Sequence, residues 1–213
     1  MAIINQGILG GVSGKIGNVI GGTWKGIDYL RIKPSSVANP KTEGQVDQRS
    51  KFSTVLRFLQ PMTDFLRVGF KLYANKMTQF NAAMSYNLYN GVTGSYPNYS
   101  IDYGNALVTR GNLTGVVGGA AASTVASTVD INWTDNSGSG SAMVTDKTLI
   151  LLYNESRGEV VFTTAGPTRS AGTESISVPP EYTGEDVEVF LGFISEDGSK
   201  VSNNAYLGSV TVA

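Results

Sequence analysis

The sequence predicts a mixed α+β fold in which a β-hairpin and two or three helices precede an all-β sandwich. Three changes of pattern along the chain support this fold. Apolar residues alternate with polar ones between residues 15 and 33, recur near every 3.6 residues between 43 and 89, and alternate again after residue 105. We therefore expect two domains, one over residues 1–100 with an arm, the hairpin and the helices, and one over residues 101–213 with the sandwich.

Glycine is concentrated at the start of the chain, with seven in residues 7–22. Residues 1–14 form an arm that holds five large aliphatic side chains but too many glycines to build a core. We expect residues 15–33 to form a β-hairpin that turns at Gly21-Gly22, because paired glycines readily adopt the backbone of a two-residue turn. An isolated hairpin is marginally stable in water, so this one should pack on its own helices or on another copy.

The predicted hairpin carries large aromatic side chains that so small a unit cannot easily bury. Trp24 and Tyr29 should therefore contact something outside the hairpin, either the helices of the same chain or another molecule. Guanidinium groups bind carboxylates or phosphates with two parallel hydrogen bonds, although Asp28 and Asp47 are also available as intramolecular partners for the arginines. The candidate interface residues are Lys15, Trp24, Tyr29, Arg31 and Arg49.

The start of the helical region has a sequence signature. Thr42 and Gln45 fit a capping box, in which the Thr side chain accepts a hydrogen bond from a backbone amide and the Gln side chain reaches back to the cap. The first helix should run from this cap to Pro61, which closes it. A second helix should cover residues 61–71 and a third residues 74–89, unless the two form one kinked helix.

The remaining chain is predicted to form a tyrosine-rich loop at residues 95–103 followed by eight short strands. Clusters of Gly, Asn, Asp, Ser and Pro separate the strands, and short strands at this spacing are typical of a β-sandwich. Trp133 ends one of the alternating stretches and is expected in the sandwich core. The predicted strands cover residues 105–110, 112–117, 128–133, 147–153, 159–164, 173–178, 186–194 and 204–212.

The composition excludes catalysis that depends on Cys or His and leaves carboxylates, Lys, Tyr, Ser and Thr as possible catalytic groups. The chain contains neither Cys nor His, so it has no disulfide, no thiolate nucleophile, no imidazole base and no Ser-His-Asp triad. We assign no catalytic, cofactor-binding or metal-binding residue. We expect the protein not to be an enzyme and to have no cofactor and no small-molecule substrate.

Three local patterns that could indicate a binding or catalytic site have simpler structural explanations. The Gly-Lys pair at residues 14–15 would complete a P-loop only with Gly at position 9 and Ser or Thr at position 16, where the chain has Leu9 and Ile16. The aspartates within residues 130–146 suit turns better than a calcium loop. The acidic cluster at residues 181–188 alternates with apolar residues, as on a solvated strand face.

Charge is distributed unevenly along the chain. Residues 1–76 carry eleven Lys or Arg and four Asp or Glu, a net +7, whereas residues 77–213 carry five and thirteen, a net −8. Such asymmetry fits a nucleic-acid partner, head-to-tail contact between copies, or two independently solvated domains. Nucleic acid is the least favoured partner, because no helix-turn-helix or RNA-binding signature accompanies the basic half.

The sequence shows no targeting or membrane segment. The first residues lack the basic and apolar regions of a secretory signal, and no run of about 18 apolar residues is present to span a bilayer. We therefore expect the protein in the cytoplasm or in a virion, without a membrane partner.

Two motifs near the N-terminus carry a resemblance to a known family. They are Gly-Lys-x-Gly-Asn at residues 14–18 and Asn-Pro-x-Thr-x-x-Gln-x-x-x-Arg at residues 39–49. In this order they resemble a Bacteroidota and phage-associated family, to which no function is assigned and whose chains are about as long as this one. The half after residue 100 resembles fibronectin type III and immunoglobulin-like modules. The resemblance implies the two-part layout and no mechanism.

Together these features favour a non-catalytic structural or assembly protein. We expect it to be homo-oligomeric through its N-terminal arm and hairpin, with itself or other particle subunits as partners, such as the subunits of a phage virion. A binding module that recognises glycan or protein through the sandwich loops is the alternative. A nucleic-acid-associated protein that uses the basic half is the second alternative.

Overall fold

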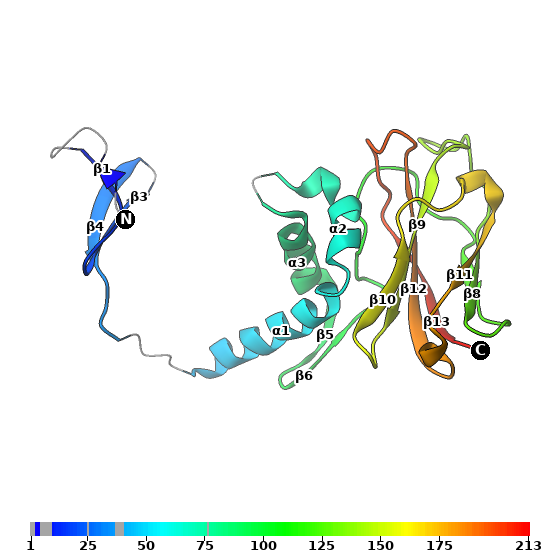
Figure 1. The fold of residues 1–213 in the computed structure, drawn as a ribbon, viewed down its shortest axis with the longest axis horizontal. Helices are drawn as coiled ribbons and strands as arrows, with labels where there is room; N and C mark the ends of the chain where they lie inside the picture. The colour runs from blue at the N-terminus through cyan, green and yellow to red at the C-terminus, as the bar shows by residue number, and fades with distance from the viewer. Residues whose placement is uncertain (1–2, 5–9, 25, 37–40, 76) are drawn as a thin grey trace. The chain divides into compact units, whose positions relative to one another are not determined.

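The structure, a computed structural model, describes residues 3–4, 10–24, 26–36, 41–75 and 77–213 (Figure 1). The chain divides into two compact units, Met1–Thr42 and Glu43–Ala213, which we call the first unit and the second unit. This division differs from the boundary expected near residue 100. The helices belong with the sandwich because they share a hydrophobic core with one of its sheets.

The first unit is an antiparallel sheet with the strand order β1-β2-β3-β4 (Figure 1). Its strands are β1 (Ile3–Ile4), β2 (Val12–Ile16), β3 (Val19–Trp24) and β4 (Ile27–Ile32). The prediction of a single hairpin that turns at Gly21-Gly22 is wrong, since both glycines lie within β3. The chain instead reverses at Gly17 and at Gly26, whose φ angles of 57° and 82° lie in the left-handed region that favours glycine.

The glycine pair inside β3 has a different role from the predicted one. A Cβ atom on Gly21 would lie 2.0 Å from the carbonyl oxygen of Val12, and one on Gly22 would lie 3.2 Å from the hydroxyl oxygen of Tyr29. Both glycines therefore permit a close approach rather than a turn. Much of the predicted arm, residues 1–2 and 5–9, lies outside the described part of the chain.

The second unit begins with a helical layer. Its helices are α1 (Glu43–Leu59), α2 (Thr63–Gly69) and α3 (Gln79–Asn90), with a short 3₁₀ helix η2 (Lys71–Tyr73) between the last two. Thr42 directly precedes α1 and Gln45 lies in its first turn, where the predicted cap places them; their capping hydrogen bonds stay a prediction. The third helix starts later than expected because Thr78 caps it, its hydroxyl accepting a hydrogen bond from the Asn81 amide at 3.2 Å.

The predicted tyrosine-rich loop is a hairpin instead. Strands β5 (Val92–Ser95) and β6 (Asn98–Ile101) pair antiparallel around Tyr96-Pro97, whose peptide bond is cis. Tyr99 is half-buried, and its hydroxyl donates a hydrogen bond to Asp47 of α1. The loop prediction is wrong because a strand can form from Asn, Tyr and Ser when a helix covers every second side chain.

Two antiparallel sheets make up the sandwich. One has the strand order β10-β9-β12-β13 and the other β11-β8-β7. Six of the eight predicted strands are confirmed, each end within one residue. The strands are β7 (Ala120–Ala122), β8 (Thr128–Asn132), β9 (Lys147–Asn154), β10 (Glu159–Thr163), β11 (Thr173–Ser177), β12 (Asp186–Ile194) and β13 (Ala205–Thr211).

The predicted strands at residues 105–110 and 112–117 are wrong. That segment is irregular, and a side chain supplies hydrogen bonds that a neighbouring strand would otherwise make. Asn204 Oδ1 accepts from the amides of Val108 and Thr109 at 2.8 and 3.1 Å. The alternation in this segment therefore reflects which side chains are buried and not a ladder of strands.

The four-stranded sheet is buried on both faces. In β9, Leu149, Leu151 and Tyr153 pack in a core shared with the helices, whereas Ile150 and Leu152 pack in the core between the two sheets. Figure 1 shows the resulting layers of the second unit: helices, four-stranded sheet and three-stranded sheet. Removing the helices would expose an apolar sheet face.

A fragment of residues 43–213 should fold like the whole second unit, whereas residues 101–213 alone should not. The shorter fragment would expose Leu149, Leu151 and Phe190, which pack in the core shared with the helices, at a cost of roughly 1.5–3 kcal/mol for each large side chain. Near-UV circular dichroism and urea unfolding of both fragments check this. A cooperative transition of the shorter fragment with the stability of the longer one would contradict it.

Candidate functional site

Four of the five predicted interface residues lie on one face of the first-unit sheet. Side chains of cross-strand partners point to the same face of a sheet. Lys15 of β2 and Arg31 of β4 are both cross-strand partners of Ile20 in β3. Tyr29 lies two residues before Arg31 on β4, and Trp24 lies four residues after Ile20 on β3, so both point to this same face. We call this surface the cationic-aromatic face. It is made by Lys15, Trp24, Ile27, Tyr29 and Arg31.

The aromatic part of this face is hollowed and open to solvent. Trp24, Ile27 and Tyr29 line a hollow of 360 Å³ and are 63%, 66% and 45% exposed. The Tyr29 ring lies across β3 at Gly22, where a larger residue would meet it. The hollow can receive an apolar or aromatic group from a partner.

The opposite face of the sheet is aliphatic. It carries Ile16, Val19, Leu30 and Ile32, whose exposed fractions run from 38% to 77%. Among residues 10–24, 26–36 and 41–42, only Gly21 is buried. The described sheet therefore has no hydrophobic core of its own, and contiguous apolar surfaces of this kind mark interaction sites.

One edge of the sheet is open as well. In the described chain, β4 pairs with β3 alone. The amide of Lys33 donates a hydrogen bond to the carbonyl of Asn18 at 2.7 Å. Because hydrogen-bonded residues alternate along an antiparallel pair, the odd-numbered residues of β4 make backbone hydrogen bonds to β3. The backbone amides of the even-numbered residues point away from the sheet. Charges and proline limit the pairing of such edges with other strands, and Arg31, Lys33 and Pro34 stand at the end of β4.

The two units differ in charge. The first unit carries five Lys or Arg and one Asp, a formal +4, and the second carries eleven Lys or Arg and sixteen Asp or Glu, a formal −5. Arg49, the fifth predicted interface residue, lies in α1 of the second unit and not in the sheet. The charge asymmetry is therefore smaller across the structural division after Thr42 than across residue 76, because residues 43–76 of the second unit carry six Lys or Arg and three Asp or Glu.

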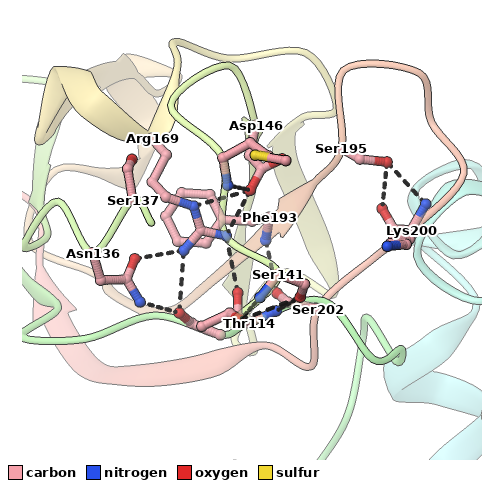
Figure 2. A network of polar contacts seen from close by, with 12 residues as sticks. Thr114, Asn136, Ser137, Ser141, Asp146, Arg169, Phe193, Ser195, Lys200 and Ser202 are labelled. Carbon is pink, nitrogen blue, oxygen red and sulfur yellow. Dashed lines mark hydrogen bonds and ion pairs between the residues drawn. The ribbon is translucent and has the colours of Figure 1, made fainter. Parts of the chain in front are cut away.

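The sequence did not predict a buried polar network at the loop end of the sandwich (Figure 2). Arg169 is fully buried, and its Nε and Nη2 each lie 3.1 Å from Asp146 Oδ2. Its Nη2 also donates to the carbonyl of Thr114 at 2.9 Å. Its Nη1 donates to Asn136 Oδ1 at 2.6 Å and to the carbonyl of Gly115 at 3.3 Å.

This network is part of the sandwich core. The Arg169 guanidinium stacks at 3.7 Å on the Phe193 ring, and the Arg169 carbonyl accepts a hydrogen bond from the Trp133 indole at 2.7 Å. Trp133 is buried in the core, which confirms its predicted role. Burial lowers the pKa of Arg169, and Asp146 opposes this effect, as in an ion pair removed from water. Asp146 lies in a loop and Arg169 begins a short 3₁₀ helix, Arg169–Ala171, so no periodic sequence pattern signals their contact.

A second hollow adjoins this network. It measures 420 Å³ and is lined by Leu113 and by residues of two loops, 141–146 and 195–200. Asp146 Oδ2 accepts hydrogen bonds from Arg169 and from the amide of Met143, but its Oδ1 is buried without a hydrogen-bond partner among the described residues. This oxygen can accept a hydrogen bond from a bound group.

The aspartates considered as calcium ligands do not converge. Asp135 belongs to a turn, where hydrogen bonds from the Ser137 hydroxyl and amide lower its pKa. Within the described ranges, no group of three or more His, Cys, Asp or Glu side chains is placed to hold a metal ion. Nor is any helix in those ranges both long and apolar enough to cross a membrane.

The two sheets define the class of the second unit. Three antiparallel strands, β7, β8 and β11, face the four strands β9, β10, β12 and β13. This is a fibronectin type III-like β-sandwich, here with a helical layer added to the outer face of its four-stranded sheet.

The chain belongs to a family described as "Family of unknown function (DUF6266)", whose model matches residues 11–208. It is also similar to solved structures. The fn3 domain of human collagen alpha-1(XX) chain has 12% sequence identity and a TM-score of 0.37, over 48% of this chain and 87% of that one. The chicken CNTN1 FN1-FN3 domains have 7% identity and a TM-score of 0.36, over 48% of this chain and 33% of that one. No curated protein matches the chain.

Arg169→Met should destabilise the second unit by about 3–5 kcal/mol, because it leaves the Asp146 carboxylate buried without its cation. Urea unfolding of residues 43–213 measures the loss. Arg169→Met/Asp146→Leu should recover part of it, since both charges are then removed together. A loss below about 1 kcal/mol for the single variant, the range of an ordinary surface change, would contradict this role.

Proposed function

We propose that this chain is a non-catalytic assembly protein that forms a homo-oligomer through the sheet of its first unit. The observation that supports the proposal is the exposure of both faces of that sheet. Trp24, Ile27 and Tyr29 on one face and Leu30 and Ile32 on the other are between 45% and 77% exposed. A small sheet without a core is marginal in water, and a neighbouring subunit supplies the missing cover.

Covering these side chains offers enough free energy to hold subunits together. Burial of each large apolar side chain contributes roughly 1.5–3 kcal/mol. Five such residues can therefore exceed the lower estimates of the cost of association, which run from about 4 to 15 kcal/mol. Repetition of one contact around a closed symmetry stabilises the whole assembly. A particle of many copies, such as a phage virion assembled in the cytoplasm, is the setting we propose.

Trp24→Ala/Tyr29→Ala should dissociate the oligomer, because it removes the aromatic part of the cationic-aromatic face. Size-exclusion chromatography with light scattering should report a species larger than 22.5 kDa for the unaltered chain and a smaller one for the variant. Tyr89→Ala is a matched control, since Tyr89 is an aromatic residue of the second unit that is 84% exposed. An unaltered chain that stays monomeric at high protein concentration would contradict the proposal.

Gly21→Val should abolish assembly by a different route. A Cβ atom at this position would lie 2.0 Å from the Val12 carbonyl oxygen, so the sheet cannot close around it. Calorimetry should show an unchanged unfolding transition for the second unit. Gly44→Ala is the control, because a Cβ atom there meets nothing within 4 Å. Normal assembly of the Gly21 variant would show that the sheet is not the connector.

A binding module that uses the sandwich loops is the second candidate function. The observation that favours it is the hollow of 420 Å³ lined by residues of loops 141–146 and 195–200. Such loops form the binding surface in variable immunoglobulin domains. Saturable shifts of the Ser141 and Ser199 amide resonances on titration with a glycan or a peptide would support this function, and unchanged resonances would argue against it.

A further inference from the structure

The second unit carries an acidic surface where β9 turns into β10 and where β12 begins. A hollow of 460 Å³ there, called the acidic hollow below, is lined by Glu155, Ser156, Glu185, Asp186 and Glu188. Arg157 pairs with Glu185 at 2.6 Å. In the described chain, the other three carboxylates have no cation at ion-pair distance, so the surface keeps an excess of negative charge.

An aromatic hollow adjoins the acidic one and shares Glu155 with it. It measures 210 Å³, and its lining includes four aromatic residues and one cation, Arg57. The aromatic residues are Phe58, Tyr99, Tyr103 and Tyr153. The Tyr103 hydroxyl is buried without a hydrogen-bond partner among the described residues. Burial, followed by the effect of the Glu155 carboxylate, raises the pKa of Tyr103, so its hydroxyl stays protonated.

These two hollows complement the cationic-aromatic face. On that face the aromatic side chains of Trp24 and Tyr29 share the sheet surface with the cations Lys15 and Arg31. In the second unit, aromatic side chains and carboxylates likewise occupy adjoining hollows. Opposite charges steer two surfaces together and fix their register, while aromatic side chains supply contact area.

We propose that the cationic-aromatic face of one copy docks on the acidic and aromatic hollows of a neighbouring copy. This inference rests on the proposed function and identifies the surface that receives the sheet. Because each copy uses one surface to dock and a different one to receive, the contact is heterologous. Copies then join head to tail, into a ring if the rotation closes and into a filament if it does not.

Pairing between the β4 edges of two copies is the competing arrangement. The end of β4 carries Arg31 and Lys33, and joining two such strands would place four cations along one seam. Like charges disfavour that pairing, whereas the carboxylates of the acidic hollow attract the same cations. The charge pattern therefore favours contact between the two unlike surfaces.

Charge reversal tests this docking in the full-length chain. The cation variant Lys15→Glu/Arg31→Glu should raise the apparent Kd of assembly about tenfold or more. The acid variant Glu155→Lys/Asp186→Lys should do the same. A chain with all four substitutions should regain most of the affinity, because its charges are exchanged rather than removed. Sedimentation equilibrium measures each Kd, and far-UV circular dichroism verifies that each variant is folded.

A matched control separates docking from a general change in net charge. Glu43→Lys/Asp64→Lys makes the same change on exposed residues of the helices, which line none of the hollows described above, and should leave assembly unaltered. If the acid variant assembles like the unaltered chain while full-length Trp24→Ala/Tyr29→Ala dissociates, the inference is overturned and the proposed function stands. A monomeric unaltered chain overturns both.

Discussion

A sheet whose strands are apolar on both faces has to be covered on both faces, and the architecture of the second unit depends on this constraint. Seven of the eight residues of β9 and seven of the nine of β12 are buried. Antiparallel sheets commonly leave one face in water, and burial of both faces is more typical of parallel sheets between helices. The helical layer and the three-stranded sheet are the two covers that β9 and β12 require, so neither the helices nor the sandwich forms a complete unit alone.

The first unit does not satisfy the same constraint within its described residues. Its strands carry large apolar side chains on both faces, and no second layer covers either face in the part of the unit that the structure describes. A surface of this kind would aggregate indiscriminately unless something restricted its partners. Lys15 and Arg31 on one face impose such a restriction, because a cation loses its hydration on docking unless the partner supplies an anion. In the proposed assembly the charges contribute specificity, while the apolar side chains contribute affinity.

Elements that show a local period of apolar residues could be predicted from the sequence. Features that depend on contact between segments far apart in the chain could not. In six strands and three helices, the strand-like or helix-like spacing of apolar residues continues along the element. Gly21-Gly22 resembles a turn signal, and only the approach of Val12 shows why β3 needs small residues there. The strands expected within residues 105–117 fail because Asn204 takes their backbone hydrogen bonds from far along the chain. The cationic and aromatic residues of the site could be singled out from the sequence by residue type. That they share one face depends on the pairing register of the strands, because a shift by one residue would move every side chain of a strand to the opposite face.

The two ends of the sandwich use charge in opposite ways. At the loop end, Asp146 and Arg169 are removed from water and tie irregular loops to the core, so their charges act on folding. At the other end, Glu155, Asp186 and Glu188 have no cation at ion-pair distance among the described residues. Exposed charges add little to stability, and a concentration of one sign raises the energy of the folded chain by self-repulsion. Asp186 and Glu188 accept hydrogen bonds from Thr211 and Tyr206, but these neutral donors leave the repulsion between the carboxylates in place. In the proposed assembly, docking on a cationic surface removes the repulsion that the free subunit carries.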